Sequence, residues 1–233
     1  MKVCLTIDVE QDCPPYLNTY RGIEEGLPLL LSLLKEEKIP ATFFVTGDVA
    51  KKHPNRIQQI VKEGHELGCH GDTHRRFDQM NIQEAEWEIS ESTRILRSFS
   101  PVISFRAPNL QFPPQYLPLL EKEGYLLDSS EGKYKFYGLR RKPVTSSLTR
   151  IPASTTSSVL RFPTWIRHTI FNCLKSPVVL FVHPWEFVDF TKSDLRWDCR
   201  FKTGKKALLC LQEVIQFFKN QKNAEFCQII SLR

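Results

Sequence analysis

The sequence contains no run of eighteen apolar residues, so we expect no membrane-spanning helix. Its start, MKVCLTIDVE, leads directly into an apolar strand pattern and lacks the basic, apolar and small-residue order of a secretory signal. The seven cysteines are odd in number and include no C-x-x-C pair, which argues against a disulfide framework and a thiolate zinc site. We therefore expect a reducing, cytoplasmic location, with most cysteines buried as small apolar side chains.

No strong excess of one charge is present. The formal charge of +6 is modest for 233 residues and spread along the chain, so a solvated surface is expected rather than a nucleic-acid or membrane partner. There is no internal repeat and no convincing domain boundary. We expect a single domain over residues 1–233, a length that is normal for an α/β barrel.

Strand-like and helix-like segments alternate along the chain, which is typical of a parallel sheet covered by helices. Asn81 and Glu84 are three apart and predict a capping box at the start of a long helix. The Ser- and Thr-rich region of about 129–170 is interpreted as an irregular insertion with strand-like fragments. The expected strands are 2–7, 41–45, 102–106, 176–187 (ending in a polar, aromatic segment) and 226–232, and the expected helices are 22–38, 54–64, 81–99, 113–124 and 203–219.

Unusual polar residues follow four strand-like segments. TIDVEQD follows the first strand, HGDTH follows HELGC, FRAPN follows VIS, and HPWE follows VVLFV. Catalytic groups of parallel α/β folds collect at the carboxyl ends of the strands, so we expect these four clusters to meet at one mouth.

His70 and His74 are candidate metal ligands. A spacing of four places both rings on one side if the stretch is helical, which suits zinc; the alternative is two surface histidines. A third ligand is needed, and Asp8, Glu10 and Asp12 are available after the first strand. Asp8 and Glu10 point the same way while the chain stays extended. A helix cap or a solvated turn is the alternative for any one of these acids.

Four other residues are candidates for the same mouth. Arg106 ends an apolar strand and either pairs with one of the acids or reaches solvent. His183 is a candidate proton donor or acceptor. Trp185 either offers an aromatic face to a substrate or covers the core, and Glu186 either orients His183, binds substrate or is exposed.

The motifs resemble those of polysaccharide deacetylases of the NodB-like group, carbohydrate esterase family four. The segments LTIDVE, ATFFVTGDVAKKHPNRIQQIVKEGHELGCHGDTH, FRAP, LDSS and HPWE occur in the order found in that family. The closest likeness is to a branch with D-V-E, H-G-x-[ST]-H, F-R-A-P, D-S-S and H-P-W-E. The resemblance runs from Lys2 to about Glu186 and is weak through 131–175 and beyond 190.

The resemblance implies a distorted or incomplete (β/α) barrel of about seven strands. It also implies hydrolysis of an amide C–N bond other than a peptide bond, in the first place N-deacetylation of an acetylated amino sugar or oligosaccharide. By position, His70 and His74 match the two histidine ligands of a divalent metal, for which we expect Zn²⁺. Asp8 matches the general base, Arg106 the arginine that positions this base, and His183 the general acid.

The sequence departs from the common family pattern at Val9, where most members have the second of two adjacent aspartates. Val9 cannot bind a metal, so the role passes to Glu10, which we prefer, or to Asp8. Asp72 is expected to be a turn or supporting residue rather than a ligand. The candidate substrate-binding residues are Trp185, Glu186, Pro108 and Asp128.

Other functions remain open at this point. The H-P-W-E branch also resembles amidohydrolases of ureides and cyclic imides. A non-catalytic carbohydrate-binding barrel is a further alternative, favoured by Val9, and a metal-dependent phosphoesterase is a weaker one. We expect a small-molecule or oligosaccharide substrate, and the oligomeric state is open.

Overall fold

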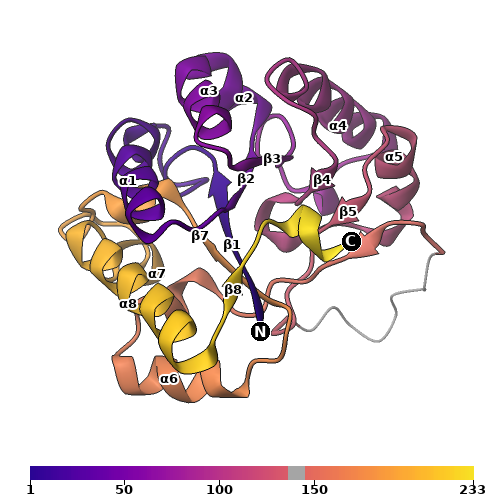
Figure 1. The fold of residues 1–233 in the computed structure, drawn as a ribbon. Helices are drawn as coiled ribbons and strands as arrows, with labels where there is room; N and C mark the ends of the chain where they lie inside the picture. Colours follow the sequence, from indigo (N-terminus) through magenta and orange to yellow (C-terminus); the bar gives the residue numbers. More distant parts are fainter. Residues whose placement is uncertain (136–144) are drawn as a thin grey trace.

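The computed structural model describes residues 1–135 and 145–233 and has an α/β fold (Figure 1). Seven parallel strands follow the order β6-β5-β4-β3-β2-β1-β7, and the short β8 pairs with the start of β1. The strands are β1 (Lys2–Val9), β2 (Thr42–Val45), β3 (Glu66–Cys69), β4 (Ser104–Phe105), β5 (Leu127–Asp128), β6 (Thr149–Arg150), β7 (Val178–Val182) and β8 (Glu225–Phe226).

The sheet curls towards a barrel. Just beyond β6, Ser154 donates its backbone N–H to the carbonyl oxygen of Val179 in β7 at 2.8 Å, and the Val179 N–H donates to Ser154 Oγ at 2.9 Å. This confirms the expected incomplete barrel of about seven strands, because the two ends of the strand order approach each other without a full ladder.

Helices surround the strands (Figure 1). The Asn81–Glu84 capping box at the start of α4 is present as predicted. A π-helical turn, Gly22–Gly26, precedes α1 within the expected helix 22–38. The helices are α1 (Leu27–Glu37), α2 (Gly47–Lys52), α3 (Pro54–Lys62), α4 (Ile82–Leu96), α5 (Leu117–Lys122), α6 (Thr164–Cys173), α7 (Trp197–Arg200) and α8 (Lys205–Lys222).

The region of about 129–170 contains β6, in agreement with the expected strand-like fragments, but also the start of α6, which was not expected; 136–144 lies outside the described residues. One expected strand was wrong. The expected strand 226–232 is only the end of β8 followed by a 3₁₀ turn, Ile229–Leu232. In this turn the Ile229 side chain is buried and its backbone N–H donates to Thr42 Oγ1 at 2.9 Å. The apolar residues of this segment therefore cover the amino end of the barrel and do not form a strand of the sheet.

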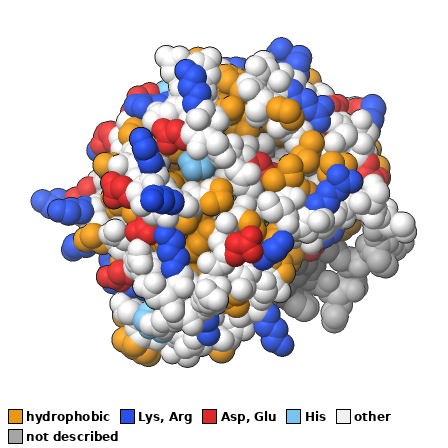
Figure 2. Space-filling view, in the orientation of Figure 1, with side chains coloured by type: hydrophobic (Ala, Val, Ile, Leu, Met, Phe, Trp, Pro, Cys, Tyr) orange, Lys and Arg blue, Asp and Glu red, His pale blue; other side chains and the backbone are white. Residues whose placement is uncertain are grey.

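The C-terminal segment therefore closes the amino end of the barrel. Ile230 N–H donates to Glu66 Oε2 at 3.1 Å at the start of β3, and the segment crosses the central strands in Figure 1. Figure 2 shows this face, on which basic and acidic side chains are interspersed. None of the helices formed by residues 1–135 and 145–233 has the length and apolar character required to cross a bilayer.

Strand β1 has two buried faces with different roles. Val3, Leu5, Ile7 and Val9 pack in the main apolar core, so by alternation the even-numbered residues face the barrel interior. Asp8 and Glu10 therefore point to the same side, as the sequence predicted, and both are 4% exposed.

Candidate metal centre and active site

The four polar clusters meet at the carboxyl end of the sheet. A cleft of about 640 Å³ lies there, with walls that include Asp8, Glu10, His70, His74 and His183. These side chains come from β1, from the loop after β3 and from the residue after β7. The convergence predicted from the strand ends is present in the structure.

Glu10, His70 and His74 form the one cluster in the described chain with ligand atoms placed to hold a metal ion, all within 4.8 Å of one another. Glu10 Oε2 lies 2.6 Å from His74 Nε2 and 3.3 Å from His70 Nε2. His70 Nδ1 lies 2.7 Å from the carbonyl oxygen of Arg106, which fixes the ring and turns Nε2 towards Glu10. One carboxylate and two imidazoles fit a divalent ion such as zinc and leave further positions open.

The histidine loop is not helical, so the condition under which a spacing of four would place both rings on one helical face is not met. Gly71 has φ +76° and His74 has φ +62°, and both values lie in the left-handed region. The rings still meet, with centroids 5.3 Å apart, because the turn and not an i, i+4 helical face brings them together.

Glu88 of α4 holds this loop, and no sequence motif predicts this role. Its buried carboxylate accepts the backbone N–H groups of Asp72 and Thr73 at 2.9 Å each, and also the Thr73 hydroxyl. Asp72 is turned towards Lys51, with Nζ–Oδ distances of 3.3 Å. This supporting position agrees with the expectation that Asp72 is not a ligand.

The three acids after the first strand take three different positions. Asp12 is fully buried and accepts from Thr19 Oγ1 at 2.6 Å and from the backbone N–H groups of Arg21 and Gly22 at 2.8 Å each. It therefore caps the turn before α1. Glu10 joins the histidines, and Asp8 pairs with a buried arginine.

Arg106 is that arginine, and its side chain is fully buried. Its Nη1 donates to Asp8 Oδ1 and Thr6 Oγ1 at 2.7 Å each, and its Nη2 donates to Ser129 Oγ at 2.9 Å. The guanidinium also lies over the Phe44 ring, 4.3 Å from its centroid. Of the two alternatives for Arg106, the structure shows pairing with an acid.

His183 lies on the other side of Glu10, with Nε2 at 3.8 Å from Glu10 Oε1. Its Nδ1 lies 2.8 Å from Glu186 Oε1, and Glu186 Oε2 lies 3.0 Å from Arg161 Nε. Glu186 is buried and does not line the cleft, so the geometry favours orientation of His183 over substrate binding for this residue.

Burial and neighbouring charges set the ionisation of these groups. Burial alone would raise the pKa of Glu10, but His74, His183 and a hydrogen bond with His70 hold it well below its usual range. Burial opposes protonation of His183, whereas Glu10 and Glu186 raise its pKa to about 9. Glu10 is therefore a carboxylate that is ready to bind a cation.

The remaining predicted site residues differ in position. Trp185 lines the cleft, stacks on His183 with centroids 4.8 Å apart, and lies with Nε1 3.4 Å from Glu10 Oε1. Pro108 and Asp128 are buried and do not line the cleft, and Asp128 Oδ2 instead pairs with Arg150 Nε at 2.6 Å. The structure thus offers no contact surface for these two with a substrate in the cleft.

Sequence reasoning missed most of the cleft wall. Arg161 is fully buried, and its Nη1 and Nη2 donate to the backbone carbonyl oxygens of Phe201 and Asp198 at 2.7 and 2.9 Å. These partners lie about 40 residues further along the chain and meet Arg161 only on folding, so no local sequence pattern marks it. The wall residues not predicted include Cys13, Tyr16, Arg76, Gln79, Asn109, Tyr134, Lys135, Arg161, Arg196, Asp198 and Cys199.

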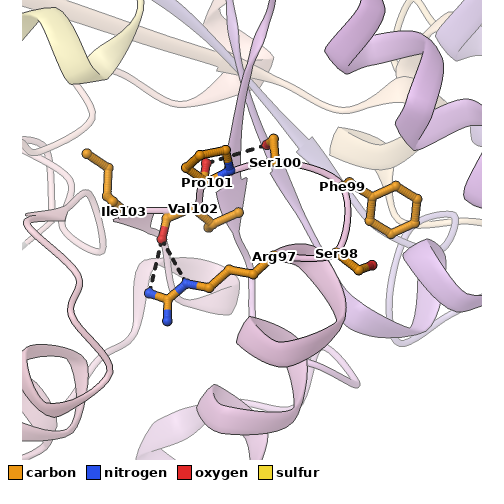
Figure 3. A pocket seen from close by; sticks show the side chains of 7 residues that line it. All are labelled: Arg97, Ser98, Phe99, Ser100, Pro101, Val102 and Ile103. Carbon is orange, nitrogen blue, oxygen red and sulfur yellow. Dashed lines mark hydrogen bonds between the residues drawn. The ribbon is translucent and has the colours of Figure 1, made fainter.

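A second hollow of about 460 Å³ lies at the loop between α4 and β4, lined by residues 97–103 (Figure 3). Arg97 folds back there and donates from Nε and Nη2 to the Val102 carbonyl oxygen at 3.4 and 3.2 Å. The lining contains no histidine or carboxylate side chain, so this hollow lacks the groups for metal or acid–base chemistry.

The sequence model of the polysaccharide deacetylases matches residues 2–127, which is more than half of the chain. The chain belongs to the polysaccharide deacetylase family. The matched part contains Asp8, Glu10, both loop histidines and Arg106, but not His183.

Two curated relatives match parts of the chain. Chitooligosaccharide deacetylase of Sinorhizobium fredii is 37% identical over 79 residues, which cover 34% of this chain and 37% of the relative. Peptidoglycan-N-acetylglucosamine deacetylase of Bacillus cereus is 33% identical over 99 residues, which cover 42% of this chain and 34% of the relative. The chain thus spans little more than a third of the length of these relatives.

Among solved structures, a candidate polysaccharide deacetylase from Mycobacterium smegmatis superposes with a TM-score of 0.76 at 20% identity. The match covers 99% of this chain and 88% of that one. At this identity the likeness shows a shared fold and nothing finer.

Proposed function

We propose that this chain is a metal-dependent deacetylase that hydrolyses the N-acetyl amide of an amino sugar or a short oligosaccharide. The observation that supports this best is the convergence of Glu10, His70 and His74 in one cleft that also contains Asp8 and His183. The family and the deacetylase names of the relatives agree with this reaction.

Zn²⁺ is the proposed metal, held by Glu10, His70 and His74, because one oxygen and two nitrogen donors suit its preferences. When bound, such an ion lowers the pKa of a coordinated water and polarises an amide carbonyl. The buried Glu10 carboxylate and the ring of His70, fixed by its contact with the Arg106 carbonyl, keep the donor atoms in place before binding.

Asp8 is the proposed general base. It faces the cleft from the same side of β1 as Glu10, so its carboxylate can accept a proton from the attacking water. Arg106 Nη1 donates to this carboxylate at 2.7 Å and fixes its orientation.

His183 is the proposed general acid for the leaving amine. Glu186 binds its Nδ1, which leaves Nε2 directed towards the cleft beside Glu10. The stacked Trp185 ring limits rotation of the imidazole. Asp8 lies on β1 and His183 follows β7, so the proposed base and acid reach the cleft from different strands.

The test is a substrate screen with the purified full chain and added Zn²⁺. We expect acetate release from N-acetylated chitooligosaccharides, abolished in His74→Ala. Turnover of allantoin or a cyclic imide without acetate release would instead support a ureide or imide amidohydrolase. Binding of the sugars without turnover of any substrate would contradict the proposed activity.

We also propose that residues 1–233 act as one domain, which the sharing of one sheet by β1 and β8 supports. The cytoplasmic location remains a prediction from the sequence. Fractionation of the producing cells would test it.

A further inference from the structure

Cys4 and Cys227 lie in contact at the amino end of the barrel. Their Sγ atoms are 3.5 Å apart although 223 positions separate them in the sequence. Val3 pairs with Phe226 in the parallel β1–β8 ladder. Cys4 follows Val3 and Cys227 follows Phe226, so the two cysteines occupy the next matched position along the two segments. Cys227 N–H donates to the Val3 carbonyl oxygen at 3.0 Å, which extends this alignment, and Figure 1 shows β8 beside the start of β1.

The surroundings of the two thiols are apolar. Cys4 and Cys227 are 0% and 7% exposed and pack in a small cluster with Phe44, Val179 and Ile229. Burial, followed by the neighbouring Cys227, raises the pKa of Cys4. In the described chain the pair belongs to no group that could hold a metal ion.

We infer that Cys4 and Cys227 form a disulfide when the chain folds in the presence of a small disulfide such as oxidised glutathione. Neighbouring strands lie about 4.8 Å apart, and disulfides bridge Cα atoms about 4.4–6.8 Å apart. The sulfur atoms need to approach by only about 1.5 Å to reach the S–S bond length of about 2.05 Å.

The chemistry is two successive exchanges. One cysteine thiolate attacks a sulfur of oxidised glutathione, which forms a mixed disulfide and releases one glutathione thiolate. The second cysteine thiolate attacks the protein sulfur of that mixed disulfide and releases the other glutathione. Two protein thiols are oxidised, one glutathione disulfide is reduced to two thiols, and the protons balance between them.

The bond would fix the short pairing of β8 with β1. Only two register pairs join β8 to β1. The segment beyond it is held by single hydrogen bonds such as that of Gln228 Nε2 to the Gly64 carbonyl oxygen, 2.8 Å. A cross-link that closes so long a loop restricts the unfolded chain strongly and stabilises the folded one. The pair lies at the opposite end of β1 from Glu10, so the inference does not depend on the proposed function.

The experiment is refolding of the full chain in a mixture of oxidised and reduced glutathione, followed by alkylation, digestion without reductant and mass spectrometry. We expect peptides joined through Cys4 and Cys227, and two fewer alkylated thiols than in the reduced chain. We also expect a rise in Tm of roughly 5–15 °C that dithiothreitol reverses.

Cys4→Ala and Cys227→Ala should each abolish the linked peptides and the rise in Tm, whereas Cys173→Ala, at an exposed position, should retain both. Should Cys4→Ala fail to fold, Cys227→Ala near the chain end provides the same comparison. Alkylation of both Cys4 and Cys227 in the oxidised, folded chain would overturn the inference. So would a linkage of another pair, such as Cys13 with Cys199, in place of theirs.

Discussion

At the scale of single residues, the site depends on how a fully buried guanidinium is satisfied. Arg106 donates to Asp8, Thr6 and Ser129, so its charge has a carboxylate partner and two hydroxyl acceptors. An unpaired buried charge would be strongly unfavourable. The same contacts that keep Arg106 in the barrel also fix the carboxylate of Asp8 at the cleft.

Asp8→Asn is expected to lower kcat by roughly 10²–10⁴-fold while metal content stays at the wild-type level. The amide cannot accept the proton of water, but Asp8 is not among the three proposed metal ligands. We also expect a loss of roughly 1.5–3 kcal/mol in the free energy of unfolding, because Arg106 loses its charged partner.

Kinetics, metal analysis and urea unfolding of the same preparation check this prediction. Glu10→Gln serves as the matched control, since it should lose metal together with activity. Loss of metal in Asp8→Asn would mean that Asp8, and not Glu10, is the third protein ligand.

Val9 and Glu10 show how far the sequence predicts the site at this scale. The period of two along an extended strand correctly places Glu10 on the side of Asp8 and turns Val9 towards the helix layer, where it is fully buried. The same reasoning could not decide which of the three acids joins the histidines. Asp12 instead accepts the backbone N–H groups of a turn, and no clear sequence pattern predicts this turn. Pro108 and Asp128 were proposed from motifs alone, and folding directs them away from the cleft.

At the scale of elements, the histidine loop is held from outside itself. The loop has two left-handed residues, Gly71 and His74, and no helical hydrogen bonds of its own. The buried carboxylate of Glu88 accepts its N–H groups, and the Gly47 N–H at the start of α2 donates to the Gly71 carbonyl oxygen at 3.0 Å. Two helices therefore position the proposed metal ligands in this loop.

Glu88→Gln is expected to weaken metal binding roughly 10–100-fold, the usual effect of removing a partner that orients metal ligands. The glutamine side chain has one acceptor oxygen in place of two. It can therefore no longer accept both the Asp72 N–H and the Thr73 hydroxyl through separate oxygens, as Glu88 does. Competition with a chromogenic chelator measures the affinity. Glu86→Gln, on the exposed side of the same helix, is the control and should bind metal like the wild type. An unchanged affinity in Glu88→Gln would exclude this role.

The π-helical turn Gly22–Gly26, which precedes α1, and the turn 184–187 are in unusually close contact. A Cβ atom on Gly26 would lie 2.0 Å from the Pro184 carbonyl oxygen, and one on Gly22 would lie 2.5 Å from the Trp185 nitrogen. Both neighbouring atoms belong to the backbone, so they cannot rotate away. The glycines thus allow the turn that follows His183 to lie against the helix.

Gly26→Ala should destabilise the protein by roughly 1–3 kcal/mol, the usual cost of an added group in a packed interior. Urea unfolding measures this loss. Ser32→Ala on the exposed side of α1 is the control and is expected to change stability by no more than about 0.5 kcal/mol. Wild-type stability of Gly26→Ala would show that the contact with Pro184 is not tight in solution.

Element prediction succeeded where a single physical signal dominates and failed where tertiary contacts decide. The capping box of α4 is a local pattern and was found. The segment 226–232 has a strand-like apolar pattern, yet Thr42 and Glu66 bind its N–H groups and turn it across the amino end of the barrel. The helical spacing of His70 and His74 was plausible by sequence but is replaced by a turn that Glu88 stabilises.

At the scale of the whole molecule, the proposed metal connects parts of the chain that are distant in sequence. Its ligands lie at the end of β1 and in the loop after β3, with β2 between these two strands in the sheet. An ion bound to this set binds the folded chain and not the unfolded one, so metal binding and folding are linked.

Removal of metal should therefore lower Tm. At a free Zn²⁺ concentration of about one hundred times Kd, the folded state gains about 2.7 kcal/mol, which corresponds to roughly 5–10 °C for a chain of this size. Protons compete with the ion for the ligand atoms, so the gain should be smaller at pH 5 than at pH 7.5. Thermal unfolding with added Zn²⁺ and with a chelator at both pH values measures these shifts. His74→Ala should have the same Tm in both conditions, and an equal Zn²⁺-dependent rise in that variant would mean that the ion binds elsewhere on the protein.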